Sequence, residues 1–279
     1  TRIGNGELHP MKYHSSKLTS INSSREYPEY IFAGGRRDKY QSIDENYPTY
    51  GFASTDSGES WKKVNVDNLI KSRTNDMFVH CTGKYAYTLT SNARVNRYNF
   101  DKGYVDLYNH KLNDISVGGI YVKHFDNDAV DPLMITIGRD SSIDPSNNNL
   151  IFYTRINNNS FNVLTDISSS AMDILSSVID LSSSALDISL SAIINGAEFN
   201  DIDGFGDSVY VVGKIGIVNF NINETTTNIS AENLHVTFND YAYNTVSAFD
   251  VSNAVIAGKN SIMHTTDAGE NWTPDKVYI

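Results

Sequence analysis

Short apolar runs rich in Tyr, Val, Ile, Phe and Thr recur along the chain, separated by clusters of Asn, Asp, Gly and Ser. Five of these runs end near a glycine or a small polar residue, and a second strand-like run and a turn follow each one. The five runs are residues 30–35, 85–91, 133–139, 209–214 and 254–259. β-Branched and aromatic residues favour strands, whereas the separating residues favour tight turns. The pattern therefore predicts an all-β protein.

The spacing of these runs indicates a repeat. Their starting positions are separated by about 55, 48, 76 and 45 residues. A period of about 45–50 residues is typical of a four-stranded propeller blade. The sequence thus predicts a β-propeller in which only the third interval is too long.

Four consecutive heptads lie inside the long interval, in residues 166–193: DISSSAM, DILSSVI, DLSSSAL and DISLSAI. Apolar residues recur at the second, sixth and seventh places of each heptad, and steps of three and four place them on one stripe of an α-helix. The stripe at the second place consists of Ile167, Ile174, Leu181 and Ile188. Without this tract the third interval is about 48 residues long, so the tract is predicted to be a helical insertion between the third and fourth blades.

These intervals divide the chain into three parts. Residues 1–165 are predicted to form blades 1–3, residues 166–194 the helical insertion, and residues 195–279 blades 4–5. The insertion either packs on its own domain, forms a coil that joins copies of the chain, or is disordered.

One eight-residue phrase occurs near both ends of the chain, as STDSGESW in residues 54–61 and as TTDAGENW in residues 265–272. The shared positions are Ser54, Asp56, Gly58 and Trp61 in the first copy and Thr265, Asp267, Gly269 and Trp272 in the second. Asp and Ser/Thr side chains accept hydrogen bonds from nearby backbone N–H groups, glycine permits a positive φ, and Trp covers the hairpin. The residue types therefore predict a stabilised turn.

The two copies resemble the Asp boxes, or BNR repeats, of sialidase-type β-propellers. The resemblance rests on these two segments alone and implies that each lies between the third and fourth strands of a blade. Asp56 and Asp267 are about 211 residues apart, which leaves about 46 residues for each of four steps once the helical tract is removed. Five blades are therefore predicted; a six-bladed propeller with one blade in the first 28 residues is the alternative.

Composition narrows the range of partners. The net charge is −11 and the pI is near 5.0, which argues against nucleic-acid binding because phosphate contacts need a basic surface. No apolar run is long enough to span a membrane. Cys81 is the single cysteine, so no intrachain disulfide can form, and its strand-like surroundings predict a buried structural thiol.

The sequence does not decide whether the protein is an enzyme, but it favours a protein without enzymatic activity. The sialidase resemblance implies three arginines that bind a carboxylate, a Tyr/Glu nucleophile pair and an Asp acid/base. The nearest arginine motif, YTRI at residues 153–156, lacks a proline and comes late in the chain, while Arg2 precedes any convincing strand. A glycoside hydrolase that uses two carboxylates stays an alternative.

No cofactor is predicted. Residues 125–131 and 201–207 are rich in aspartate, and calcium prefers such oxygen ligands. Neither segment has the glutamate spacing of a calcium-binding loop, so both are predicted to be solvated turns, with calcium left open. The histidines show no ligand-pair spacing.

The function predicted from these observations is a non-catalytic Asp-box propeller that binds a protein or a glycan, or serves a structural role. Blade-connecting loops are the expected site. The tyrosines of residues 44–52 and 239–244 are either aromatic contacts of that site or, the favoured alternative, ordinary strand residues. Besides a glycoside hydrolase, an assembly factor that binds a protein partner is an alternative, since a photosystem II assembly factor carries similar boxes. The heptads also resemble repeats in structural proteins of large algal DNA viruses, which implies an extracellular or virion-surface location. The heptads could also mediate homo-oligomers.

Overall fold

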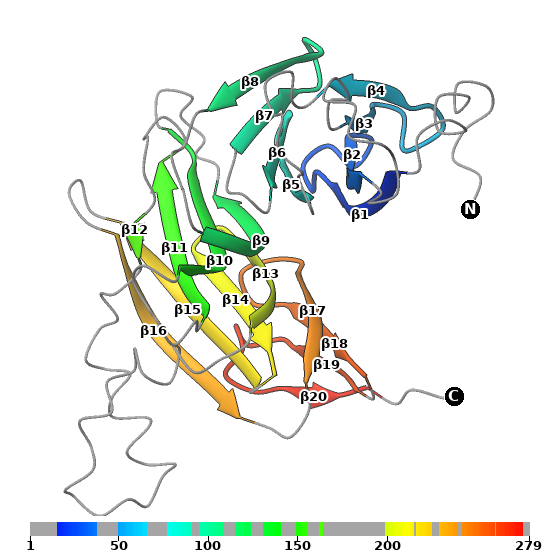
Figure 1. Ribbon diagram of the computed structural model, residues 1–279. Coiled ribbons are helices and arrows are strands. Elements are labelled where there is room, and N and C mark those ends of the chain that lie inside the picture. Colours follow the sequence, from blue (N-terminus) through cyan, green and yellow to red (C-terminus); the bar gives the residue numbers. More distant parts are fainter. Residues whose placement is uncertain are drawn as a thin grey trace, which may run out of the picture. The chain divides into compact units, whose positions relative to one another are not determined.

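The computed structural model describes the segments of the chain that carry its strands (Figure 1). The described segments are residues 16–37, 50–65, 77–90, 95–108, 115–123, 131–140, 149–155, 162–163, 199–214, 216–224, 229–238, 242–259 and 261–275. Within these segments every helix or strand is a β-strand, so the predicted all-β class is confirmed.

The strands form five four-stranded antiparallel sheets within the described segments, and we number them 1 to 5 in chain order. Sheet 1 holds β1 (Ser16–Ser23), β2 (Ile31–Arg37), β3 (Tyr50–Ser54) and β4 (Lys62–Asn65). Sheet 2 holds β5 (Met77–Thr82), β6 (Tyr85–Thr90), β7 (Val95–Asn99) and β8 (Tyr104–Tyr108). Sheet 3 holds β9 (Ile115–Lys123), β10 (Leu133–Asp140), β11 (Asn149–Arg155) and β12 (Asn162–Val163). Sheet 4 holds β13 (Phe199–Phe205), β14 (Ser208–Gly213), β15 (Gly216–Glu224) and β16 (Ile229–Phe238). Sheet 5 holds β17 (Tyr243–Ala248), β18 (Ala254–Gly258), β19 (Ile262–Thr265) and β20 (Thr273–Pro274).

Each sheet is a meander in which every strand pairs with the next one along the chain. The five apolar runs predicted from the sequence fall on β2, β6, β10, β14 and β18, the second strand of each sheet. Most described residues of β2, β6, β10 and β14 are buried, which accounts for their apolar sequences. The predicted strands and their repeating order are therefore confirmed.

The predicted helical tract, residues 166–193, lies outside the described residues, and so do its stripe residues Ile167, Ile174, Leu181 and Ile188. The number of propeller blades and the three-part division of the chain also stay predictions. In the part of the chain that the structure describes, no helix is long and apolar enough to cross a membrane.

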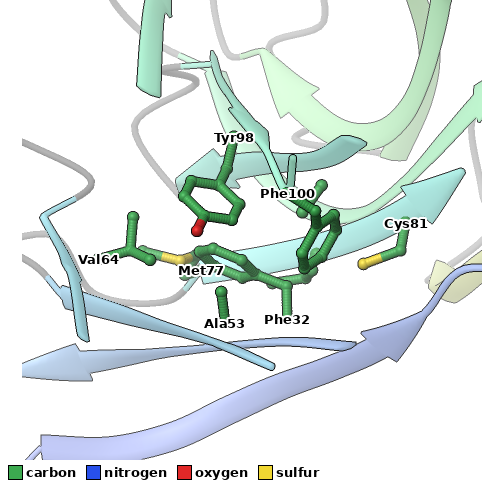
Figure 2. Close-up of a cluster of buried hydrophobic side chains, with 9 residues drawn as sticks. Phe32, Ala53, Val64, Met77, Cys81, Tyr98 and Phe100 are labelled. Atoms are coloured by element: carbon green, nitrogen blue, oxygen red, sulfur yellow. The ribbon is translucent and has the colours of Figure 1, made fainter. Parts of the chain in front are cut away.

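The chain divides into two compact units, which we describe separately. Unit 1 comprises Thr1–Leu133 with Arg155–Phe161, and unit 2 comprises Met134–Thr154 with Asn162–Ile279. The core of unit 1 fills the space between sheets 1 and 2. Figure 2 shows Phe32 and Ala53 of sheet 1 facing Tyr98 of sheet 2 and Phe100, which follows β7. Burial of these side chains is the main stabilising term of the unit.

The corresponding core of unit 2 lies between sheets 4 and 5. Its buried side chains include Tyr210, Val212 and Ile217 from sheet 4 and Tyr243 and Ile256 from sheet 5. Trp272 of the second repeated phrase packs against this core and is partly buried.

Hydrogen bonds between first strands also join sheets 1 and 2. The Val79 N–H donates to Ser20 Oγ at 3.1 Å, and the Cys81 N–H donates to Asn22 Oδ1 at 2.8 Å. Side chains of β1 thus pair with main-chain donors of β5 that no neighbouring strand of sheet 2 reaches.

Unit 2 repeats this arrangement with carboxylates. The Val246 N–H and the Thr245 hydroxyl donate to Asp201 Oδ2 at 3.0 and 2.8 Å, and the Ala248 N–H donates to Asp203 Oδ2 at 2.9 Å. We call these two sets of contacts the strand clasps. In both units they connect the first strand of one sheet to the first strand of the next.

The prediction of a solvated turn at residues 201–207 is therefore wrong for most of that segment, which belongs to β13. Asp201 and Asp203 alternate with the buried Ile202, and this period of two is the signature of a strand. The turn was predicted because aspartate and glycine are common in turns. Of the other aspartate-rich segment, residues 125–131, only Asp131 is described.

Candidate functional site

The first repeat, residues 54–61, connects β3 to β4, and a buried hydroxyl lies at its centre. Ser54 Oγ accepts the Gly58 N–H at 2.8 Å and donates to Asp56 Oδ1 at 2.7 Å. The same carboxylate oxygen accepts the Ser60 N–H at 2.9 Å, and the Trp61 indole N–H donates to the Gly58 carbonyl at 3.0 Å. All of these bonds begin and end within the repeat.

The second repeat, residues 265–272, connects β19 to β20 with the same geometry. Thr265 Oγ1 accepts the Gly269 N–H at 2.9 Å and donates to Asp267 Oδ1 at 2.7 Å. Asp267 Oδ1 also accepts the Asn271 N–H at 2.9 Å. Both repeats thus lie between the third and fourth strands of their sheets, the position that the family resemblance implies.

Two consecutive residues in each repeat have positive φ. The values are 58° and 88° at Ser57 and Gly58, and 58° and 85° at Ala268 and Gly269. Glycine takes this conformation without steric cost, whereas Ser57 and Ala268 take it at a cost that the surrounding hydrogen bonds offset.

Hydrogen bonding keeps both aspartates of the repeats ionised. The Ser60 hydroxyl and N–H, followed by the Ser54 hydroxyl, lower the pKa of Asp56. The Asn271 side chain and N–H, followed by the Thr265 hydroxyl, lower the pKa of Asp267. A carboxylate held by several donors of its own turn is poorly suited to act as an acid, a base or a nucleophile.

Each repeat also holds a second turn of the same sheet. The Ser57 N–H donates to the Glu29 carbonyl at 3.2 Å, and the Ala268 N–H donates to the Ser252 carbonyl at 2.9 Å. Both acceptors stand two residues before the second strand of their sheet. We call residues 24–30 the first braced turn and residues 249–253 the second braced turn.

An aromatic stack covers the first braced turn. The rings of Tyr27 and Tyr30 stack with centroids 5.4 Å apart, and Tyr30 stacks on Phe100 at 4.8 Å. Lys84 Nζ lies 5.8 Å from the centre of the Tyr27 ring, within the range of a cation–π interaction. Tyr27 stays exposed at the end of this stack.

Polar contacts fix the stack to sheet 2. The Tyr30 hydroxyl donates to Asp101 Oδ1 at 2.7 Å, and Lys84 Nζ bonds Asp101 Oδ2 at 2.7 Å. The Lys84 and Tyr30 hydrogen bonds lower the pKa of Asp101, and the bond to Asp101 raises the pKa of Tyr30. The tyrosine is therefore a neutral donor and the aspartate an ionised acceptor.

The second braced turn exposes two large apolar side chains. Phe249 is 57% exposed and Val251 is 53% exposed. Asp250, between them, accepts the N–H groups of Ser252 and Asn253 at 2.8 Å each. These bonds, together with those from the Asn253 side-chain amide to both carboxylate oxygens, lower the pKa of Asp250. The turn is thus held by several hydrogen bonds, and an ionised carboxylate lies between two exposed apolar side chains.

Two further hydrogen bonds, one within the turn and one from sheet 4, restrain it. The Phe249 N–H donates to the Asn253 carbonyl at 2.8 Å, which closes the turn. The Ser208 hydroxyl donates to the Val251 carbonyl at 3.3 Å. Ser208 begins β14, so the second braced turn is held both by its own sheet and by sheet 4.

Two residues whose side chains can act in catalysis, His80 and Cys81, are buried in β5. Cys81 is buried, as predicted, and its thiol donates to the Asn22 carbonyl at 3.2 Å; burial raises its pKa. Burial, followed by the charge of Arg25, lowers the pKa of His80 to about 3. The described segments contain no cluster of three or more His, Cys, Asp or Glu side chains able to hold a metal ion.

Among the described residues, the remaining candidates from the sequence do not assemble into a site. Arg155 of the YTRI motif donates to the Asp131 carbonyl, and burial lowers its pKa. Tyr243 on β17 is fully buried, so strand packing, the favoured alternative for this residue, holds and the aromatic contact does not. Tyr241 lies outside the described residues, as does most of segment 44–52.

Sequence reasoning missed the exposed residues of the braced turns. Nothing in the sequence distinguishes Tyr27, Phe249 and Val251 as contact residues, because single exposed apolar residues are common on protein surfaces. Aligning the sheets by their second strands would have placed all three in corresponding turns. Their restraint by the repeats, however, comes from contacts between residues distant in sequence.

No family model matches the sequence, and no curated protein matches it. Solved structures share its fold. YCF48 bound to D1 peptide gives a TM-score of 0.52 at 11% identity, over 93% of this chain and 67% of that one. YCF48 from Cyanidioschyzon merolae gives 0.51 at 12%, over 94% and 85%. An ancestral GH74 enzyme gives 0.54 at 14%, over 91% of this chain and 33% of the enzyme.

At these identities the likeness concerns the fold alone. It supports the β-propeller fold that the sequence predicts. The chain spans about a third of the length of the GH74 enzyme.

Proposed function

We propose that the chain is a non-catalytic β-propeller that binds a protein partner through its braced turns. The observation that carries this proposal is the exposure of Phe249 and Val251 on a turn whose backbone is fixed from two sides. Apolar side chains held in place before binding lose little conformational entropy when a partner covers them. Tyr27 on the first braced turn offers a second, aromatic contact.

The chemistry of the second braced turn favours a peptide segment that carries both apolar and basic residues. The ionised Asp250 stands between the two exposed apolar side chains, and the whole chain carries a net charge of −11. Such a surface attracts basic partners and repels acidic ones. YCF48 was solved with a D1 peptide, so a propeller of similar fold binds a peptide.

The finer architecture belongs to the same proposal. The two repeats are Asp boxes whose role is to hold the braced turns, the sheets are blades of a five-bladed propeller, and residues 166–194 are a helical insertion. Circular dichroism tests the last point, since a variant lacking residues 166–193 is expected to lose a helical signal near 222 nm.

Selection of ligands from a phage-displayed library of random peptides tests the binding role. We expect enrichment of peptides that combine apolar and basic residues. A Phe249→Ser/Val251→Ser double variant is expected to bind the selected peptides at least about tenfold more weakly, because truncating central apolar contacts typically has effects of this size.

Ile21→Ser is the matched control, because it removes a comparably exposed apolar side chain, 62% accessible, outside both braced turns. It is expected to leave the affinity unchanged. The proposal fails if no peptide is enriched, or if the selected peptides bind the double variant as tightly as the parent. Hydrolysis of xyloglucan or of a sialylated oligosaccharide by the purified chain would favour the hydrolase alternative instead.

A further inference from the structure

Three buried polar atoms gather around the second repeat without a hydrogen-bond partner among the described residues. They are the Tyr210 hydroxyl, the side-chain carbonyl of Asn219 and the indole N–H of Trp272. Tyr210 is fully buried and Asn219 is 5% exposed. More than nine in ten buried polar groups in native proteins form a hydrogen bond with protein or with ordered water. Three unpaired polar atoms near one repeat therefore indicate a further hydrogen-bond partner.

The three groups belong to adjoining elements of unit 2. Tyr210 on β14 and Asn219 on β15 stand directly opposite each other, so their side chains lie on the same face of sheet 4. The Trp272 ring meets the Tyr210 ring edge-on, with centroids 6.1 Å apart. The Asn219 side-chain N–H donates to the Ala268 carbonyl at 2.8 Å, which fixes the amide and leaves its oxygen without a donor.

The hydrogen-bonding capacity of these three unpaired atoms defines the kind of ligand that they can bind. An indole N–H can only donate, an amide oxygen can only accept, and a phenol can do both. The N–H opposes a cation and the carbonyl opposes an anion. Burial, followed by the charges of Asp250 and Asp267, raises the pKa of Tyr210 to about 12, so the phenol is neutral. A small neutral molecule with donors and acceptors matches this set.

We propose that Tyr210, Asn219 and Trp272 form a binding site for one buried water molecule, which joins the second repeat to sheet 4. The water accepts the Trp272 N–H, donates to the Asn219 carbonyl and exchanges a hydrogen bond with the Tyr210 hydroxyl. Buried waters in proteins typically make about three such bonds.

The first repeat serves as an internal comparison. There the corresponding Trp61 N–H donates to the Gly58 carbonyl at 3.0 Å, and the indole is satisfied without a bridging molecule. The water site is therefore specific to the second repeat. The water explains how the second repeat, whose internal hydrogen bonds otherwise match those of the first, accommodates the polar atoms of Tyr210 and Asn219.

A crystal structure of the full chain that resolves ordered waters tests the proposal directly. We expect density for one water within about 3.2 Å of at least two of the three atoms. Direct hydrogen bonds among the three side chains, or the absence of density between them, would overturn the proposal.

A double-mutant cycle gives a second readout. Tyr210→Phe and Trp272→Phe each delete one partner of the water and are each expected to lower the folding equilibrium constant about tenfold. Because both act through the same water, their effects are expected to be clearly less than additive, whereas Tyr210→Phe and Trp61→Phe are expected to add. If Tyr210→Phe leaves stability unchanged or raises it, the hydroxyl is not bridged and the site is refuted.

Discussion

At the scale of single residues, one hydroxyl organises each repeat. Ser54 and Thr265 are almost fully buried, and each accepts the glycine N–H while donating to the aspartate. The aspartate in turn accepts the N–H of the residue four positions ahead. The repeated side chains therefore satisfy the backbone of a turn that would otherwise leave polar groups unpaired.

The two glycines of the repeats are expected to differ in their tolerance of alanine. At Gly58 an added Cβ would meet its nearest neighbour at an ordinary 3.7 Å, so Gly58→Ala carries only the cost of its positive φ, about 1 kcal/mol. At Gly269 the Cβ would lie 2.7 Å from the amide nitrogen of Asn219 and displace its bond to Ala268. Gly269→Ala is therefore expected to cost about 2–3 kcal/mol.

Urea unfolding of the two alanine variants measures this difference. Equal losses of unfolding free energy would contradict the close approach of Asn219 to the second repeat. Both variants leave the hydroxyl and carboxylate of each repeat unchanged, so the comparison isolates the backbone and the contact with Asn219.

The burial of His80 predicts that the free energy of unfolding decreases at acidic pH. It is buried edge-on against Tyr121, 5.2 Å between ring centroids, and burial lowers its pKa from 6.5 to about 3. Between these two pH values the unfolded chain binds a proton that the folded chain does not. Stability is therefore lost as pH falls below about 6.5, by up to about 1.4 kcal/mol per pH unit from this residue.

Denaturant unfolding between about pH 6.5 and about pH 5 checks this prediction, since most carboxylates stay ionised there. A His80→Phe variant is expected to show a shallower pH dependence than the parent. An imidazole NMR signal of His80 that titrates near its ordinary pKa would show that the side chain is accessible to protons and would refute the argument.

At the scale of elements, the strand clasps connect sheets that share no strand pairing. Ser20 and Asn22 of β1 accept backbone N–H groups of β5, and Asp201 and Asp203 of β13 do the same for β17. The two strand clasps also occupy corresponding positions, because β1 and β13 each have a register shift just before the residues that form the clasp. Alternating polar residues in a first strand are therefore part of the scaffold.

The folding stability that Asp201 contributes depends on pH with the opposite sign to that of His80. Burial raises its pKa above the ordinary 3.8, and its three hydrogen bonds offset this only in part. The folded state thus favours the protonated carboxyl, and the stability that this residue contributes falls as pH rises through its folded pKa. Replacing Asp201 with Asn removes the charge and is expected to remove this loss.

Thermal unfolding of Asp201→Asn and of the parent from about pH 3.5 to about pH 7 provides the measurement. The melting temperature of the variant relative to the parent is expected to rise with pH. A relative melting temperature that instead falls with pH would mean that the hydrogen bonds outweigh burial and that the carboxylate is the favoured form.

At the scale of the whole molecule, the sequence predicted the recurring strands and missed the contacts between distant residues. The second strands were found because apolar runs such as residues 209–214 recur at blade spacing. The clasp of Asp201 with Val246 joins residues 45 positions apart, and no local pattern reveals it. Likewise the repeat residues were identified from their spacing, but the turns that they hold became visible only through contacts such as that of Ser57 with Glu29.

We propose that the repeats hold in place the turns that bind a partner, and amide hydrogen exchange of the chain with a selected peptide tests this proposal. The peptide is expected to slow exchange in residues 249–253 of the parent chain, and the Phe249→Ser/Val251→Ser variant is expected to show no such protection. Protection confined to segments outside both braced turns, with residues 24–30 and 249–253 unchanged, would contradict it.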